Sequence, residues 1–313
     1  MASYRESRDL HPLRAVIAMA ALAGIALFSA PAAATEEKIF TTPEQAVDAL
    51  LAAARAGNTE ALLKVLGPGS RKLVRSGDAV ADAQSRGKFL TAYQEENRIE
   101  STGDDRVVLA VGKDDWPFPF PIVRRGDGWA FDASAGAQEI LARRIGANEL
   151  NAIEVCHAYV DAQREYAEKD RNHDDYVEYA QKIVSSPGKR DGLYWPAAAD
   201  EEESPIGPLM AKARAEGYTA EKTGHQPYHG YYYRILKGQG AAAKGGAYDY
   251  VLNGHMIAGF ALVAFPARYG VSGIMTFIVN HDDVVYQKDL GPNTAKLARE
   301  MSLFDPDSGW TAP

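Results

Sequence analysis

The sequence predicts an α+β protein in which helices are followed by a small antiparallel sheet twice along the chain. Apolar residues first recur every three or four positions, as on one face of a helix, and then at every second position, as in a half-buried strand. The same succession begins again after residue 146. Of the 313 residues, 46% are hydrophobic and 24% are charged, which is the composition of a globular protein with an ordinary core.

The first 34 residues have the pattern of a secretory signal peptide. Three arginines precede an uncharged apolar run at residues 15–28, which is shorter than the roughly 20 residues that cross a bilayer. The small residues SAPAAA then offer an A-x-A cleavage site that ends at Ala34. We therefore expect cleavage before Thr35 and a periplasmic or secreted protein without a membrane span. The alternative is an uncleaved anchor.

Residues 35–146 form the first predicted α+β unit. A helix begins after the N-cap residue Thr42, has Pro43 in its first turn and ends before Gly57. Asn58 caps a second helix that runs to residue 66, and a third helix covers about residues 78–93. Alternating apolar residues then predict short strands at 106–111, 119–124 and 128–131.

Residues 147–313 form the second predicted unit, a long helix followed by an antiparallel β-meander. Helical periodicity covers residues 135–146 and, after a break, residues 149–170. Strands are predicted at 231–236, 256–265, 274–279 and 284–287, and a last helix at 294–301. The polar turn NHDD at residues 280–283 joins the last two strands.

Charge and cysteine content exclude several classes of function. The net charge of −8 opposes nucleic acid or an anionic membrane as the main partner. The single cysteine, Cys156, excludes an internal disulfide, a cysteine zinc cage and an iron–sulfur cluster. It lies on the apolar face of its helix, so we interpret it as a buried thiol rather than a nucleophile.

The segment DRNHDDYVE at residues 170–178 has oxygen ligands at alternating positions, as a calcium loop requires. Asp170, Asn172 and Asp174 are the candidate ligands, and calcium is the only cofactor that the sequence suggests. Asp175 replaces the turn glycine of an EF-hand, and Gln181 replaces its bidentate glutamate. A solvated acidic end of the preceding helix accounts for the same pattern, and both interpretations stay open.

Two other patterns are interpreted as coincidences. His225 and His229 have the spacing of a zinc pair on a helix, but Pro227 between them opposes a helix. Residues 186–189 fit the S-x-x-K motif of penicillin-recognising enzymes, but Pro187 opposes the helix that this motif needs.

A functional surface is predicted in residues 185–196, where turn-forming residues favour an exposed loop. Flat amphipathic rings mixed with charges can hold a sugar or a peptide. The candidate ligand-binding residues are Lys189, Arg190, Asp191, Tyr194 and Trp195. The structural alternative is that Trp195 anchors the loop in the core while Asp191 pairs with Arg190 or Arg234.

The second half of the chain contains a series of short sequence motifs in this order: YAQK (179–182), GKRDGLYWP (188–196), SPIGPL (204–209), GFALVA (259–264), TFIVN (276–280) and VYQKDLG (285–291). In these motifs the mature chain resembles a bacterial exported family, domain of unknown function 2950. The resemblance implies export and architecture but no catalytic residue. The order of long helix, loop and meander also looks like the globular head of type IV pilin-like and pseudopilin proteins. Filament formation is not implied, because the helix lies in the middle of the chain.

The sequence does not identify a molecular function. We interpret the chain as a non-enzymatic binding or scaffold protein for a cell-envelope protein or glycan. The alternative is a periplasmic hydrolase that acts on envelope glycan or peptide. An enzyme should gather carboxylates and histidines with shifted pKa values in one deep pocket, whereas a binding protein should present an aromatic groove or an apolar patch.

Overall fold

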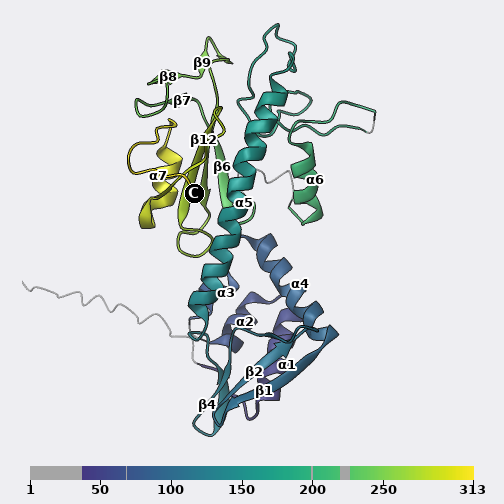
Figure 1. The fold of residues 1–313 in the computed structure, drawn as a ribbon. Coiled ribbons are helices and arrows are strands. Elements are labelled where there is room, and N and C mark those ends of the chain that lie inside the picture. Colours follow the sequence, from purple (N-terminus) through teal and green to yellow (C-terminus); the bar gives the residue numbers. More distant parts are fainter. Residues whose placement is uncertain (1–36, 68, 199, 219–225) are drawn as a thin grey trace, which may run out of the picture. The chain divides into compact units, whose positions relative to one another are not determined.

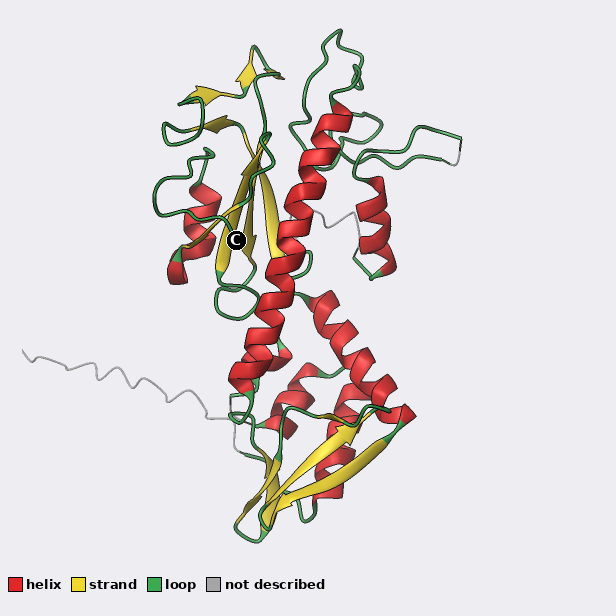
Figure 2. Ribbon diagram, viewed as in Figure 1, coloured by secondary structure: helices red, strands yellow, loops and turns green. Residues whose placement is uncertain are grey.

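The computed structural model describes residues 37–313 except for residues 68, 199 and 219–225. The described residues form one compact unit. Its helices and antiparallel sheets confirm the predicted α+β class (Figure 2). The predicted signal peptide, residues 1–34, lies outside the described residues. Within the described part of the chain, every helix is too short or too polar to cross a membrane.

The first helices begin at the predicted capping residues. The Thr42 hydroxyl accepts a hydrogen bond from the Gln45 N–H at the start of α1 (Pro43–Arg55). The Asn58 side chain accepts one from the Ala61 N–H at the start of α2 (Thr59–Leu66). The short helix α3 (Arg71–Val74) follows, and then α4 (Ala79–Glu95).

Asp78, the N-cap of α4, is fully buried and accepts four hydrogen bonds. Its Oδ1 accepts from the backbone N–H groups of Val80 and Ala81, each at 3.1 Å. Its Oδ2 accepts from the Tyr218 hydroxyl at 2.8 Å and from the Gly230 N–H at 3.0 Å. One carboxylate therefore caps a helix and joins segments about 140–150 positions apart in the chain.

The first sheet has the strand order β1-β2-β4-β5, with β3 paired to β2. Its strands are β1 (Asn97–Gly103), β2 (Arg106–Val111), β3 (Trp116–Pro117), β4 (Ile122–Arg125) and β5 (Gly128–Phe131). β2 and β5 have the predicted bounds. β4 begins later than predicted, because Pro119 and Pro121 have no N–H to donate to a ladder. β1 is not predicted by the sequence, because its mostly exposed, polar residues lack the expected alternation; pairing with the apolar β2 stabilises it.

The second sheet is the predicted antiparallel meander, with the strand order β6-β11-β12-β13. Its strands are β6 (Tyr231–Leu236), β11 (Ala261–Pro266), β12 (Met275–Asn280) and β13 (Tyr286–Asp289). The strand predicted at 256–265 begins only at Ala261. Gly259 has a φ of +151°, and a Cβ there would lie 2.9 Å from the Tyr250 ring, so the chain bends at this glycine.

Short two-stranded pairs occupy the connection between β6 and β11. β7 (Gly238–Gln239) pairs with β8 (Tyr248–Asp249), and β9 (Val251–Leu252) pairs with β10 (His255–Met256). The 3-10 turn η2 (Gly291–Asn293) leads into the last helix, α7 (Thr294–Glu300).

One continuous helix, α5 (Ala137–Tyr166), stands where the sequence predicts two helices, at 135–146 and 149–170. Gly146 lies inside it, although glycine costs about 1 kcal/mol in a helix interior. Packing compensates for the cost of this glycine, because α5 contacts α3 as well as β11 and β12. The described residues form two hydrophobic cores, one before and one after the middle of α5 in sequence. The division into domains at residues 146 and 147 stays a prediction.

Helices α5 and α7 cover opposite faces of the second sheet (Figure 1). Alternate residues of β6 point to opposite faces. The Tyr231 hydroxyl lies beside Glu149 of α5, whereas the Arg234 guanidinium donates to the backbone carbonyls of Ala298 and Met301, in and just after α7. Cys156 of α5 is fully buried, and burial raises the pKa of its thiol to about 12, which is the property of an inert core residue.

Between α5 and α6 (Gly207–Ala215), the described residues of 167–206 have almost no regular structure and are held by buried polar side chains. Gln163, which is fully buried, donates from Nε2 to the Ala180 carbonyl and accepts at Oε1 from the Ala180 N–H, both at 2.8 Å. The Arg171 side chain is 3% exposed and donates to the carbonyls of Glu165 and Tyr166 at the end of α5. These side chains satisfy backbone groups that a strand or helix would otherwise pair.

Candidate functional site

The two aromatic residues of the predicted binding loop are part of the core. Tyr194 and Trp195 are buried within the hydrophobic cluster of the second sheet. The Trp195 indole N–H donates to the Glu202 carbonyl at 3.1 Å. The Arg214 guanidinium lies 5.0 Å from the centre of the Tyr194 ring and donates to its hydroxyl. Both rings therefore anchor the loop, as in the structural alternative derived from the sequence.

Two charged residues of the loop are tied to the scaffold. Arg190 pairs with Glu202 at 3.1 Å and lies over the Trp195 ring. Asp191 pairs with neither Arg190 nor Arg234: its partners are the Lys182 ammonium at 2.6 Å and the Ser186 N–H and hydroxyl at 2.7 and 3.0 Å. Lys182 reaches Asp191 because backbone hydrogen bonds join Lys182 to Leu193 and Ser185 to Tyr194, on either side of the loop.

Partial burial of Asp191 works toward a higher pKa, but the hydrogen bonds from Lys182 and Ser186 outweigh it and lower the pKa to about 2. The Lys189 side chain, by contrast, is exposed and makes no ion pair with any residue that the structure describes. A ligand-binding role for the five loop residues stays a prediction.

The predicted calcium ligands have other partners. Asp170 accepts three backbone hydrogen bonds, from His173 at 2.7 Å, Asp174 at 3.3 Å and Asp175 at 3.0 Å. Asn172 turns its amide nitrogen, not its oxygen, toward Asp174, at 2.8 Å. Asp170 thus serves the turn itself, whereas Asn172 also donates to Glu178 Oε1 at 2.8 Å. Calcium binding by Asp170, Asn172 and Asp174 stays a prediction.

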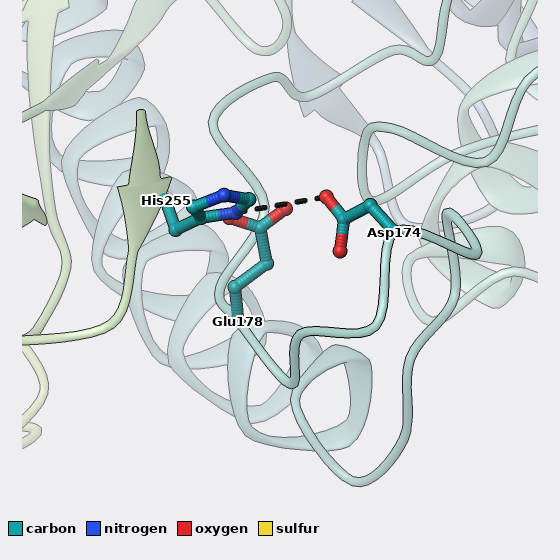
Figure 3. Close-up of side chains that lie close together, drawn as sticks. All are labelled: Asp174, Glu178 and His255. Atoms are coloured by element: carbon teal, nitrogen blue, oxygen red, sulfur yellow. Dashed lines mark ion pairs between the residues drawn. The ribbon is translucent and has the colours of Figure 1, made fainter. Parts of the chain in front are cut away.

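A different group of possible metal ligands forms around Asp174. The side chains of Asp174, Glu178 and His255 point toward one another (Figure 3), and their ligand atoms lie within 4.8 Å of one another. His255 Nδ1 is 3.3 Å from Glu178 Oε2 and 3.6 Å from Asp174 Oδ2. The ring of Tyr176 stacks on the imidazole with 3.9 Å between ring centres and fixes its orientation.

This donor set suits zinc or manganese better than calcium. One imidazole nitrogen with two carboxylates is typical of transition metals, whereas calcium takes six to eight oxygens. The Glu178 carboxylate is also held in place, since Oε2, the atom that faces His255, accepts a hydrogen bond from the Met256 N–H at 3.1 Å. The sequence does not predict the group, because His255 of β10 lies far along the chain and no local spacing connects it to Asp174.

An apolar cavity lies between α5, α6 and β6, and residues 226–228 contribute to its lining. Its volume is about 110 Å³. Aliphatic side chains of α6 and five tyrosines line it, among them Leu209, Met210, Ala213, Tyr159, Tyr228 and Tyr233. The sequence does not predict this cavity, because its lining joins residues of α5, α6 and β6 that lie far apart in the chain.

Two polar atoms of residues that line this cavity are buried without a hydrogen-bond partner in the described part of the chain. They are the hydroxyl of Tyr233 and Oε1 of Gln226. Burial raises the pKa of Tyr233 far above its usual range, so the hydroxyl is protonated. A buried polar atom without a partner costs about 1–3 kcal/mol.

Residues 37–312 match the profile of the family described as "Protein of unknown function (DUF2950)". Comparisons with curated proteins and with solved structures find no match. The likeness to a pilin head therefore stays a prediction. Because the match spans nearly all of the described chain, the protein belongs to the DUF2950 family.

Proposed function

We propose that this protein is a non-enzymatic binding protein that holds a small, largely apolar ligand in the cavity between α5, α6 and β6. The observation that carries the proposal is the cavity itself, because core packing normally leaves few voids larger than a water molecule. Its volume of about 110 Å³ is close to that of the engineered cavity of about 150 Å³ that binds benzene.

The chemistry of the lining favours binding over hydrolysis. Its described residues are aliphatic and aromatic side chains together with Gln226, Arg214 and Pro227, and none of them is a carboxylate or an imidazole. A hydrolase needs a nucleophile or a general base at the reacting bond. The group of Asp174, Glu178 and His255 supplies such residues, but none of the three lines the cavity.

The proposed place of action is the periplasm or the exterior of the cell. The support is the leader of residues 1–34, with its positive start, short apolar run and small residues before Thr35. A cell-envelope protein or glycan remains the proposed partner in that compartment, and the exposed Lys189 belongs to the loop on which we expect it to bind.

Filling the cavity tests the proposed function. Ala213 of α6 is 7% exposed and lines the cavity, so Ala213→Leu should occupy it. Ala211 lies on the same helix but is exposed, which makes Ala211→Leu the matched control. We expect saturable binding of toluene to the wild type and to Ala211→Leu by calorimetry, and loss of it in Ala213→Leu. Equal binding to both variants would contradict a role for the cavity.

A further inference from the structure

We infer that Asp174, Glu178 and His255 form a zinc-binding site. The three side chains come from two separate parts of the chain, the segment after α5 and the strand β10, and they point toward one another (Figure 3). None of the three lines the apolar cavity, so this inference is independent of the proposed function. A bound ion would join the segment after α5 to the β9–β10 hairpin.

The distances between the donor atoms fit a tetrahedral zinc ion. Ligand atoms that lie about 2.0–2.1 Å from zinc in this geometry are about 3.3–3.4 Å apart. His255 Nδ1 is 3.3 Å from Glu178 Oε2 and 3.6 Å from Asp174 Oδ2. The side chains of Asp174 and His255 are 34% and 23% exposed, so an ion can enter and water can take the fourth ligand position.

The imidazole nitrogen that faces the carboxylates gives a second, independent observation. His255 Nδ1 is buried and has no hydrogen-bond partner in the described part of the chain. The oxygens of Asp174 and Glu178 lie beside it, but neither forms a hydrogen bond with it. Buried polar atoms normally have a partner, and a metal ion bound to the lone pair of a neutral imidazole is such a partner.

The charges of the group also favour a cation. In the described part of the chain His255 is the ion-pair partner of both carboxylates, and neither pairs with a lysine or arginine. The Glu178 side chain is 10% exposed, and a buried carboxylate is costly unless it is paired or binds a metal. Asn172 Nδ2 donates to Asp174 Oδ2 and to Glu178 Oε1, both at 2.8 Å, and so holds the two carboxylates beside each other.

Titration with Zn²⁺ tests the site by calorimetry. The protein is purified without a histidine tag from the cells that make it, treated with EDTA and dialysed. We expect one Zn²⁺ to bind per wild-type chain. Loss of an outer-shell partner commonly costs about 10–100-fold in metal affinity, so Asn172→Ala should weaken zinc binding by this factor. Asp174→Asn and His255→Gln remove ligands and should each weaken it more than about a hundredfold.

Asp175→Asn is the matched control for Asp174→Asn. It makes the same change at the next residue, which is exposed, and asparagine tolerates the φ of +70° at this position. Zinc affinity should be unchanged in this variant. Circular dichroism without zinc checks that each variant is folded. The two ligand variants lie in different segments, so a folding defect in one leaves the other as the test.

Three outcomes would overturn the zinc site. They are a wild type that binds no Zn²⁺, a folded ligand variant that binds it as tightly as the wild type, and tighter binding of Ca²⁺ than of Zn²⁺. The last result would favour a calcium loop at residues 170–174 instead. Mn²⁺ should bind more weakly than Zn²⁺, because a given set of nitrogen and oxygen ligands prefers zinc.

Discussion

Replacing Asp191 by alanine should destabilise the protein, because this carboxylate holds the turn of residues 185–196. It accepts hydrogen bonds from the Lys182 ammonium and from the Ser186 N–H and hydroxyl. The pKa of Asp191 falls from an ordinary 3.8 to about 2. At 1.36 kcal/mol for each pKa unit, this difference corresponds to about 2.4 kcal/mol at neutral pH. Solvent screening at the surface reduces the expected loss to about 1–2 kcal/mol.

The dependence on pH follows from the direction of that pKa change. Because the folded pKa of Asp191 is lowered, the unfolded chain binds the proton more readily than the folded protein does. The stabilisation is therefore fully present above about pH 4–5 and is lost as the pH falls toward about 2. Urea unfolding of wild type and Asp191→Ala at pH 7 and at pH 3 measures this, and the two proteins should differ less at pH 3.

Lys189→Ala is the matched control, since Lys189 lies in the same loop, is exposed and makes no ion pair with a described residue. Its free energy of unfolding should stay within about 0.5 kcal/mol of wild type. A change below about 0.5 kcal/mol in Asp191→Ala at pH 7 would refute the reasoning. Asp191 would then belong to a binding surface rather than to the scaffold.

Three further outcomes are expected. Asp78→Ala should cost more than about 2 kcal/mol in urea unfolding, because a helix cap is lost and buried donors are left unpaired; a value near zero would contradict this. One equivalent of Zn²⁺ should raise the melting temperature of the wild type but not of Glu178→Gln; an equal rise in both would place zinc elsewhere. Mass spectrometry of the protein from the envelope fraction should find Thr35 as the first residue, and a retained leader would overturn the predicted cleavage.

The elements that the sequence predicts best have local causes. Thr42 and Asn58 cap the helices that follow them, and the alternation of apolar residues fixes the bounds of β2 and β6. The edge strand β1 could not be predicted in this way, because its place depends on pairing with β2 and not on its own residues. The continuity of α5 through Gly146 could not be predicted either, because it depends on contacts with elements distant in the chain.

The candidate sites were less predictable because they join distant parts of the chain. Asp174 is a predicted metal ligand, but its imidazole neighbour, His255, comes from β10. The spacing of residues 170–174 predicts converging oxygens, whereas Asp170 uses both of its oxygens for backbone N–H groups. The cavity combines residues of α5, α6 and β6, and side-chain packing across such distances leaves no periodic signal in the sequence.

The pairing of Gln163 with Ala180 bears on how the chain can vary. The Gln163 amide presents one acceptor and one donor to the backbone of a single residue, as a neighbouring strand would. Glutamate would bring a carboxylate against the Ala180 carbonyl, and leucine would leave two buried backbone groups unpaired. The apolar residues around it tolerate exchanges that conserve volume. Saturation mutagenesis should therefore find this buried amide less replaceable than the hydrophobic side chains that enclose it.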